Sequence, residues 1–330
     1  MPQQAKRFVA LAAAGAMLAG CANMNGPLAA DPADSCGTYV TQLNSTGDYF
    51  TGDILRGAAV GAVTGGVVGG LASGNWRGAL IGAGVGAAVG AAGGYLSALQ
   101  QQNRDQAALN AQLAGDLGRE NEGLDRTQIA FNQLMDCRFQ QAEAIRRDAR
   151  DNKLPRDVAQ SRMADLRTRT QRDIEGARQI SGRVGTRAAE FDTAVDAVSP
   201  GAVAAAKGRR VGRPVTTRAP TAVAVRLRPD AGAPTIAEVK PRDQVTLRPS
   251  STPGFARVES NGQTIGYAET RSFGAAARGV ASPIASPGAA GGSGDVRSLA
   301  ASNIARRENF QDSVATASAA ASGSGFELAG

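Results

Sequence analysis

The most constraining feature of this 330-residue chain is a glycine at nearly every fourth position of an apolar stretch, residues 52–99. One glycine costs a helix about 1 kcal/mol relative to alanine, so the repeat requires a compensating interaction. Residues four apart lie on one face of a helix, where missing side chains let two backbones approach closely. The repeat therefore predicts two antiparallel helices packed groove against groove. Its glycines form two runs: Gly57, Gly61, Gly65 and Gly69, then Gly78, Gly82, Gly86, Gly90 and Gly94.

The polar residues between the two glycine runs, "SGNWR" at 73–77, predict the turn of this hairpin. Each arm is about long enough to cross a bilayer core. Arg56 at one end and Trp76 and Arg77 at the other suit the membrane interfaces. Ala and Gly contribute little to insertion, so a tightly packed soluble hairpin is the alternative. The repeated small residues also leave surface for further copies of the chain, which favours a homo-oligomer.

The stretch from Arg56 to Leu96 resembles the glycine-zipper segment of small outer-membrane lipoproteins of the surface-antigen type. The resemblance implies a pair of membrane-associated helices.

The N-terminus carries a basic start (Lys6, Arg7), the apolar run "FVALAAAGAM" and the sequence "LAGC" ending at Cys21. Small residues before a cysteine at this distance resemble the lipobox of bacterial lipoproteins. The resemblance implies that residues 1–20 are a signal peptide, that Cys21 is acylated and binds membrane lipid, and that residues 21–51 form a tether. Ala22, where an aspartate usually causes inner-membrane retention, implies delivery to the outer membrane and its periplasmic face. An ordinary signal peptide with a chance cysteine is the alternative.

Export changes the interpretation of the remaining two cysteines. In an oxidising compartment, and with Cys21 acylated, Cys36 and Cys137 form an even pair. We predict a disulfide between them, which would join the segment before the glycine repeat to the segment after it. Two free buried thiols are the alternative.

Residues 100–198 are polar, with apolar residues recurring mostly at spacings of three, four and seven. "DNKLPRD" interrupts the pattern, and Pro155 is well placed to open a second helix. The pattern predicts a helical, coiled-coil hairpin whose charges form a solvated face, and the lipoprotein resemblance implies that this hairpin stands in the periplasm. The stripes that carry the prediction are Leu109, Leu113, Leu117, Leu124, Phe131, Leu134, Met135, Phe139 and Ile145, then Ile174, Ala177, Val184, Ala188, Phe191, Val195 and Val198.

The C-terminal part divides into a basic linker (199–220), a β-module (221–273) and a low-complexity tail (274–330). Five short alternating runs between Pro, Gly and Asn predict five strands of a small barrel. "VRLRP" at 225–229, "GFARV" at 254–258 and "GQTIGY" at 262–267 resemble bacterial SH3-like domains, which implies cell-wall or protein binding. Phe255, Tyr267 and Arg228 are the candidate binding residues, although the two aromatics equally suit the barrel core. We expect the tail to be largely disordered, with one helix starting near Asp295.

The chain contains no histidine, which removes Ser/His/Asp catalysis and the commonest metal ligand and general base. The glycine run lacks the Gly-Lys-Ser/Thr ending of a phosphate loop. We therefore predict a non-enzymatic envelope lipoprotein with no cofactor and no metal, of mainly α fold with a small all-β module. Its expected partners are membrane lipid, peptidoglycan or another envelope protein, and further copies of itself. Nucleic acid is not expected as a partner despite the +7 net charge, because an exported lipoprotein does not meet it. An oligomeric pore built from the zipper helices is the alternative.

Overall fold

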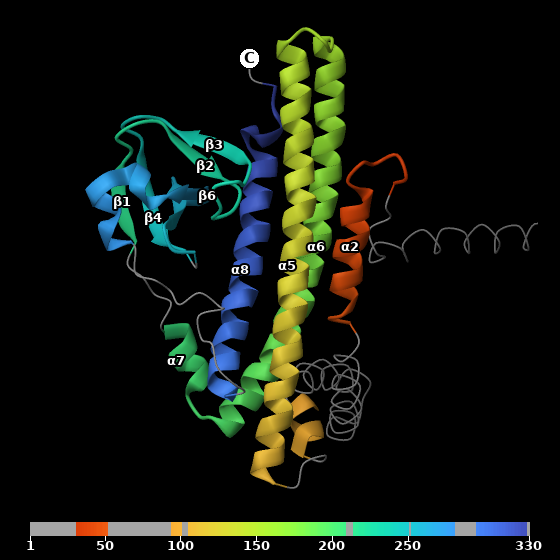
Figure 1. Cartoon of the computed structure of the whole chain (residues 1–330), viewed down its shortest axis with the longest axis vertical. Coiled ribbons are helices and arrows are strands. Elements are labelled where there is room, and N and C mark those ends of the chain that lie inside the picture. The colour runs from red at the N-terminus through yellow and green to blue at the C-terminus, as the bar shows by residue number, and fades with distance from the viewer. Residues whose placement is uncertain are drawn as a thin grey trace, which may run out of the picture.

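A computed structural model describes residues 31–51, 94–100, 105–208, 214–250, 252–280 and 295–328. They form a mainly helical molecule with a six-stranded antiparallel sheet (Figure 1). Cys21, the predicted turn at 73–77 and the repeat glycines from Gly57 to Gly90 lie outside the described residues. None of the helices in these described ranges is both long and apolar enough to cross a bilayer.

Two long antiparallel helices, α5 (Gln106–Arg150) and α6 (Arg156–Val198), form the axis of the molecule (Figure 1). The Asp105 carboxylate caps α5 by accepting a hydrogen bond from the Ala108 amide. Asn152, at a positive φ of 56°, turns the chain, and Pro155 precedes the first turn of α6. Most of the apolar stripe on each helix is buried, so the periodicity locates the packed faces correctly.

A third long helix, α8 (Val296–Ser322), packs along both α5 and α6. The expectation of a largely disordered tail is therefore wrong for residues 295–328, where the helix expected near Asp295 runs for 27 residues. Its larger apolar residues follow one another at spacings of three, five, six and four. Many of the residues between and after them are Ala and Ser, whose small side chains allow close helix packing. Phe310 is 1% exposed and meets Phe131 of α5 edge to face, with ring centroids 5.8 Å apart. A short 3-10 turn, η2 (Ser324–Phe326), follows.

The predicted linker also contains regular structure. Helix α7 (Ala202–Gly208) and strand β1 (Val215–Arg218) both lie within residues 199–220. Val203 and Ala206 of α7 are buried in a core cluster that includes α8 residues Val296 and Ile304. The interpretation of this segment as a linker is thus corrected. Its Pro and Gly residues indicated a linker, although a short apolar helix lies between them.

A short helix, α2 (Gly37–Asp48), lies on the side of the α5–α6 pair away from the sheet (Figure 1). Its buried residues Val40 and Leu43 enter the main core with Leu134 and Ile180. Residues of α2 thus extend the two-helix hairpin into a four-helix packing with α8 on the other side.

The sheet follows the order β1-β4-β5-β6-β2-β3, and every pairing is antiparallel. The five predicted strands correspond to β2 (Val223–Arg226), β3 (Thr235–Val239), β4 (Gln244–Pro249), β5 (Phe255–Ser260) and β6 (Gln263–Glu269). Among the described strands, β1 and β3 are edges that do not pair with each other, so the sheet is open where the sequence predicts a barrel. A 3-10 segment, η1 (Thr270–Gly279), follows β6.

Two glycines explain local features of the sheet. Asn261 and Gly262 have φ values of 52° and 77°, which suits the tight turn between β5 and β6. Gly266 has a φ of 142°, and a Cβ there would lie 2.5 Å from Val225 and 2.6 Å from the Arg226 carbonyl oxygen. The close approach of β6 to β2 therefore depends on a missing side chain.

The β-module packs on α8 through β6, so it is part of the same body as the helices (Figure 1). Arg257 of β5 pairs with Asp312 of α8 at 2.6 Å, and Arg228 pairs with Asp136 of α5 at 2.5 Å. Helix α8 supplies the packing surface that joins the β-module to the helices, and the sequence did not assign this surface to packing.

Candidate anchoring site

The described residues on either side of the glycine repeat are held by the same region of the helical bundle. Tyr49 and Phe50 follow α2, before the repeat, and Tyr95 lies in a helix over residues 94–100 at its end. All three contact residues of α5 or α6, as detailed below. We call the cluster of Tyr49, Phe50, Tyr95, Arg187 and Phe191 the zipper base.

Arg187 of α6 is the central residue of the zipper base. Its guanidinium carbon lies 5.4 Å from the Tyr49 ring centroid, 5.8 Å from that of Phe50 and 5.9 Å from that of Phe191. Cations within about 6 Å of an aromatic face are attracted by the ring quadrupole. The guanidinium also pairs with Glu120 of α5, Nη2 to Oε2 at 2.5 Å, and the two side chains are 6% and 2% exposed. The buried charge of Arg187 is therefore compensated on both sides.

Tyr95 attaches the other end of the repeat. Its ring centroid lies 5.0 Å from that of Phe191, and its hydroxyl donates a hydrogen bond to Asp116 Oδ2 at 2.5 Å. Burial, and secondly this hydrogen bond to a carboxylate, raise the pKa of Tyr95. The hydroxyl therefore remains a proton donor throughout the ordinary pH range.

The two attachments lie close together along α5. The Tyr49 ring packs on Gly123, where an added Cβ would come within 2.7 Å of it, and Tyr95 bonds Asp116. Seven residues of helix separate these contacts by about 10 Å. The described residues before and after the repeat thus contact α5 at nearly the same height, as the base of a hairpin requires.

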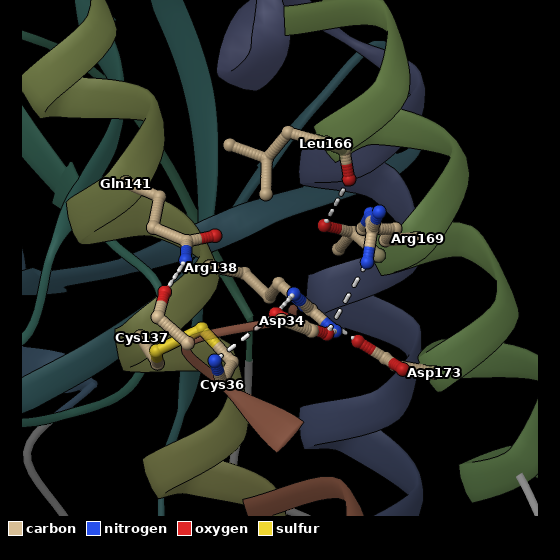
Figure 2. Close-up of a disulfide and its surroundings, with 10 residues drawn as sticks. Asp34, Cys36, Cys137, Arg138, Gln141, Leu166, Arg169 and Asp173 are labelled. Atoms are coloured by element: carbon tan, nitrogen blue, oxygen red, sulfur yellow. Dashed lines mark hydrogen bonds and ion pairs between the residues drawn. A yellow bond between two sulfur atoms is a disulfide. The ribbon is translucent and has the colours of Figure 1, made fainter. Parts of the chain in front are cut away.

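A second attachment, further from the repeat, fixes the start of α2. Cys36 and Cys137 form the predicted disulfide, with Cα atoms 6.0 Å apart (Figure 2). Beside it, Arg138 donates to Asp34 Oδ2 at 2.6 Å from Nη2 and to Asp173 Oδ2 at 2.7 Å from Nε. Arg138 is 1% exposed. These residues, which we call the disulfide clasp, join α2 to both α5 and α6.

The carboxyl groups of the clasp are shifted in opposite directions. Burial would raise the pKa of Asp34, but hydrogen bonds from Arg138 and the Cys36 amide outweigh it and hold that pKa below its usual value. Burial dominates at Asp173 and raises its pKa despite the bond from Arg138. The disulfide clasp therefore favours the charged form of Asp34 and disfavours the charged form of Asp173.

The structure also places the three candidate binding residues of the β-module. Tyr267 is 5% exposed in β6, where burial raises its pKa, so it is a core residue of the module. Phe255, in β5, is half-buried. Arg228 pairs with Asp136 and Asp230, which ties it to α5. The three do not form a single cluster in any interaction that the structure records.

Sequence reasoning missed the charged residues of both attachments, although a signal was present. Arg187 lies three residues after Val184 and four before Phe191, which puts a cation in the apolar seam of α6. Glu120 has the same relation to Leu117 and Leu124 in α5. Opposite charges at seam positions of two antiparallel helices indicate a buried ion pair, which the pattern of apolar residues alone did not reveal.

Comparison with known families finds a match for the segment that lies between these attachments. Residues 56–100 match a family model described as a glycine zipper of the outer-membrane-protein type. The match ends within the described helix that carries Tyr95. No curated protein and no solved structure matches the chain. The glycine zipper indicates a membrane-associated envelope protein.

Proposed function

We propose that this protein is a non-enzymatic lipoprotein of the outer membrane, anchored by acylated Cys21 and by an antiparallel glycine-zipper hairpin. The observation that supports the proposal is the zipper base. It joins both ends of the zipper segment to one rigid site through Tyr49, Tyr95 and Arg187. A repeat held in this way is presented as a hairpin, whose groove-to-groove packing offsets the helix cost of its glycines.

The long helices then carry the rest of the protein away from the membrane. The turn after Arg150 lies 34 residues along α5 from Asp116 of the zipper base, about 50 Å at 1.5 Å per residue. The β-module, for which we propose an SH3-like role, is fixed to this support by α8. We propose that it presents a surface to peptidoglycan or to another envelope protein in the periplasm.

Leucine substitutions in the zipper test the proposal. Gly82→Leu and Gly86→Leu place a bulky side chain in a close backbone groove, which overpacks it by about 1–3 kcal/mol. Both variants should lose protease resistance of the zipper in isolated envelopes. Gly185→Leu is the matched control, because nothing lies within 4 Å of a Cβ at this helix position.

Mass spectrometry of the mature protein completes this test. Residues remaining before Cys21, or an unmodified Cys21, would overturn the lipoprotein assignment. Wild-type protease resistance in both zipper variants would overturn the packed hairpin.

The glycine repeat itself favours a second candidate function, an oligomeric pore. Nine small residues on two faces leave surface for neighbouring copies once each hairpin has closed. Conductance across bilayers reconstituted with the pure protein tests it: discrete channels lost in Gly86→Leu favour the pore, and an insulating bilayer favours the anchor.

A further inference from the structure

A groove runs along the outer face of α2, with a volume of about 610 Å³. It begins at Asp31, the first described residue, and ends at Ser45, three residues before the end of α2. Most of its lining side chains are small and uncharged. The lining residues are Asp31, Pro32, Asp34, Gly37, Thr38, Thr41, Gln42 and Ser45.

The position of Asp31 imposes a demand on the chain that precedes it. Asp31 pairs with Arg169 of α6 at 2.8 Å, whereas the zipper base is at Arg187 of the same helix. Eighteen residues of α6 separate these levels, about 27 Å. If Cys21 is acylated and the zipper enters the same membrane, the chain from Cys21 to Asp31 must cover at least that distance.

Ten residues meet this demand only when they are extended and follow a direct path. A fully extended chain of ten residues spans about 33 Å, which leaves about 6 Å to spare. A helix of ten residues spans only about 15 Å and falls short. The direct path from Asp31 towards the zipper base lies along α2, where the groove is.

We propose that residues 22–30 lie extended along α2 and antiparallel to it, with residues 25–30 in this groove, so that the acyl anchor and the zipper meet the same membrane surface. This inference rests on the proposed function. The tether then rises along α2 from the membrane to Asp31, turns at the disulfide clasp, and returns as α2 itself.

The chemistry of the tether matches the groove. Its sequence, "ANMNGPLAA", has no charge and mostly small side chains. The two carboxylates at the upper end of the groove are already paired, Asp34 with Arg138 and Asp31 with Arg169. The hydroxyls of Thr41 and Ser45 donate to the Gly37 and Gln42 carbonyl oxygens of α2, so their oxygens can still accept hydrogen bonds from the backbone or the Asn23 and Asn25 amides of the tether. The Thr38 hydroxyl and the Gln42 amide can both donate and accept.

Paired cysteines test the position and direction of the tether. At about 3.3 Å per residue, Leu28 should lie near Thr38 and Asn25 near Ser45. The variants Leu28→Cys with Thr38→Cys, and Asn25→Cys with Ser45→Cys, should therefore react with a short bifunctional thiol reagent in intact envelopes. The native disulfide and the acylated Cys21 leave only the engineered thiols free.

The exchanged pairs, Leu28→Cys with Ser45→Cys and Asn25→Cys with Thr38→Cys, are matched controls and should crosslink severalfold less. Equal yields in all four variants, or crosslinks in none, would overturn the docking of the tether. The same samples are examined for acylated Cys21 and for flotation with membranes. Acylated, floating protein without the register-specific crosslinks refutes the inference alone, whereas unmodified Cys21 refutes the proposed function.

Discussion

At the scale of single residues, the buried Arg187–Glu120 pair contributes both to the stability of the bundle and to the proposed anchoring of the zipper. Removing one partner of such a pair leaves an uncompensated buried charge, which costs about 3–5 kcal/mol. We expect Arg187→Met to lower the free energy of unfolding by that amount and to loosen both ends of the zipper. Urea denaturation of the detergent-solubilised protein measures the change.

The double variant Arg187→Met with Glu120→Leu separates charge from packing. Because an apolar pair of similar volume often replaces a buried ion pair without loss, it should recover most of the stability. The cation–π contacts to Tyr49 and Phe50 would still be lost, at about 0.5–1 kcal/mol or more each. A double variant as unstable as the single one would show that the aromatic contacts, and not charge compensation, dominate.

The two carboxyl groups of the disulfide clasp should give opposite pH dependences. The pKa of Asp34 is lower in the folded protein, so its contribution is present above the unfolded pKa, near 4, and is lost as pH falls through the folded value. The pKa of Asp173 is higher in the folded protein, so protonation of Asp173 stabilises the fold as pH falls. Urea midpoints between about pH 7 and about pH 3 should fall less steeply in Asp34→Asn and more steeply in Asp173→Asn. Parallel profiles for both variants would contradict these shifts.

At the scale of elements, the packing of α2 on α5 depends on a glycine. A Cβ at Gly123 would lie 2.7 Å from the Tyr49 ring, whereas nothing lies within 4 Å of a Cβ at Gly118 of the same helix. Gly123→Ala should therefore displace Tyr49 and destabilise by about 1–3 kcal/mol through overpacking. Gly118→Ala should stabilise by about 0.5–1 kcal/mol, because alanine favours a helix. Thermal unfolding of both variants checks the difference in sign, and stabilisation by both would mean that Tyr49 moves aside freely.

A buried residue of helix α8 should contribute more to the free energy of unfolding than an exposed residue of the long helices. Phe310 is 1% exposed, so Phe310→Ala should cost about 3–5 kcal/mol. Ile129 of α5 is 52% exposed, so Ile129→Ala should change stability by less than about 0.5 kcal/mol. Similar denaturation midpoints for the two variants would show that α8 is not part of the cooperative core.

The elements that the sequence predicts well are those whose apolar residues repeat in a clear pattern. The stripes of α5 and α6, the turn at Pro155 and the strands β2 to β6 follow from spacing and turn residues alone. Helix α8 was underestimated because its apolar residues are diluted by Ala and Ser, a composition that also typifies disordered tails. Strand β1 was not predicted, because its four residues, which follow Pro214, contain a single apolar side chain and so show no alternation of apolar and polar residues in the sequence.

The candidate site was predictable only in part. The pairing of Cys36 with Cys137 follows from counting cysteines in a chain that its N-terminal sequence predicts to be exported. The zipper base does not, because its members come from positions 49, 50, 95, 187 and 191, and only the tertiary fold brings them together. Charged residues at apolar seam positions of α5 and α6 indicate that a buried ion pair exists, but they do not identify which two residues form it.

At the scale of the whole molecule, the disulfide closes a loop that contains the entire zipper match. Its sequence separation is 101 residues, and a loop of this length corresponds to about 4–5 kcal/mol on the chain-entropy estimate. The disulfide fixes the start of helix α2. This helix is also held by Asp34 before its start and by Tyr49 and Phe50 after its end. Loss of the disulfide should therefore loosen α2 without unfolding the bundle.

The double variant Cys36→Ser with Cys137→Ser tests this hierarchy by amide hydrogen exchange. Protection should fall first over residues 37–48 and remain in the buried middle of α5, α6 and α8, since their contacts with one another do not pass through α2. Ser250→Ala, in the β-module, serves as a control that leaves protection of α2 unchanged. A uniform loss of protection through all four helices would mean that the disulfide supports the whole bundle. Unchanged protection of α2 would mean that the ion pairs and the zipper base hold it without the covalent bond.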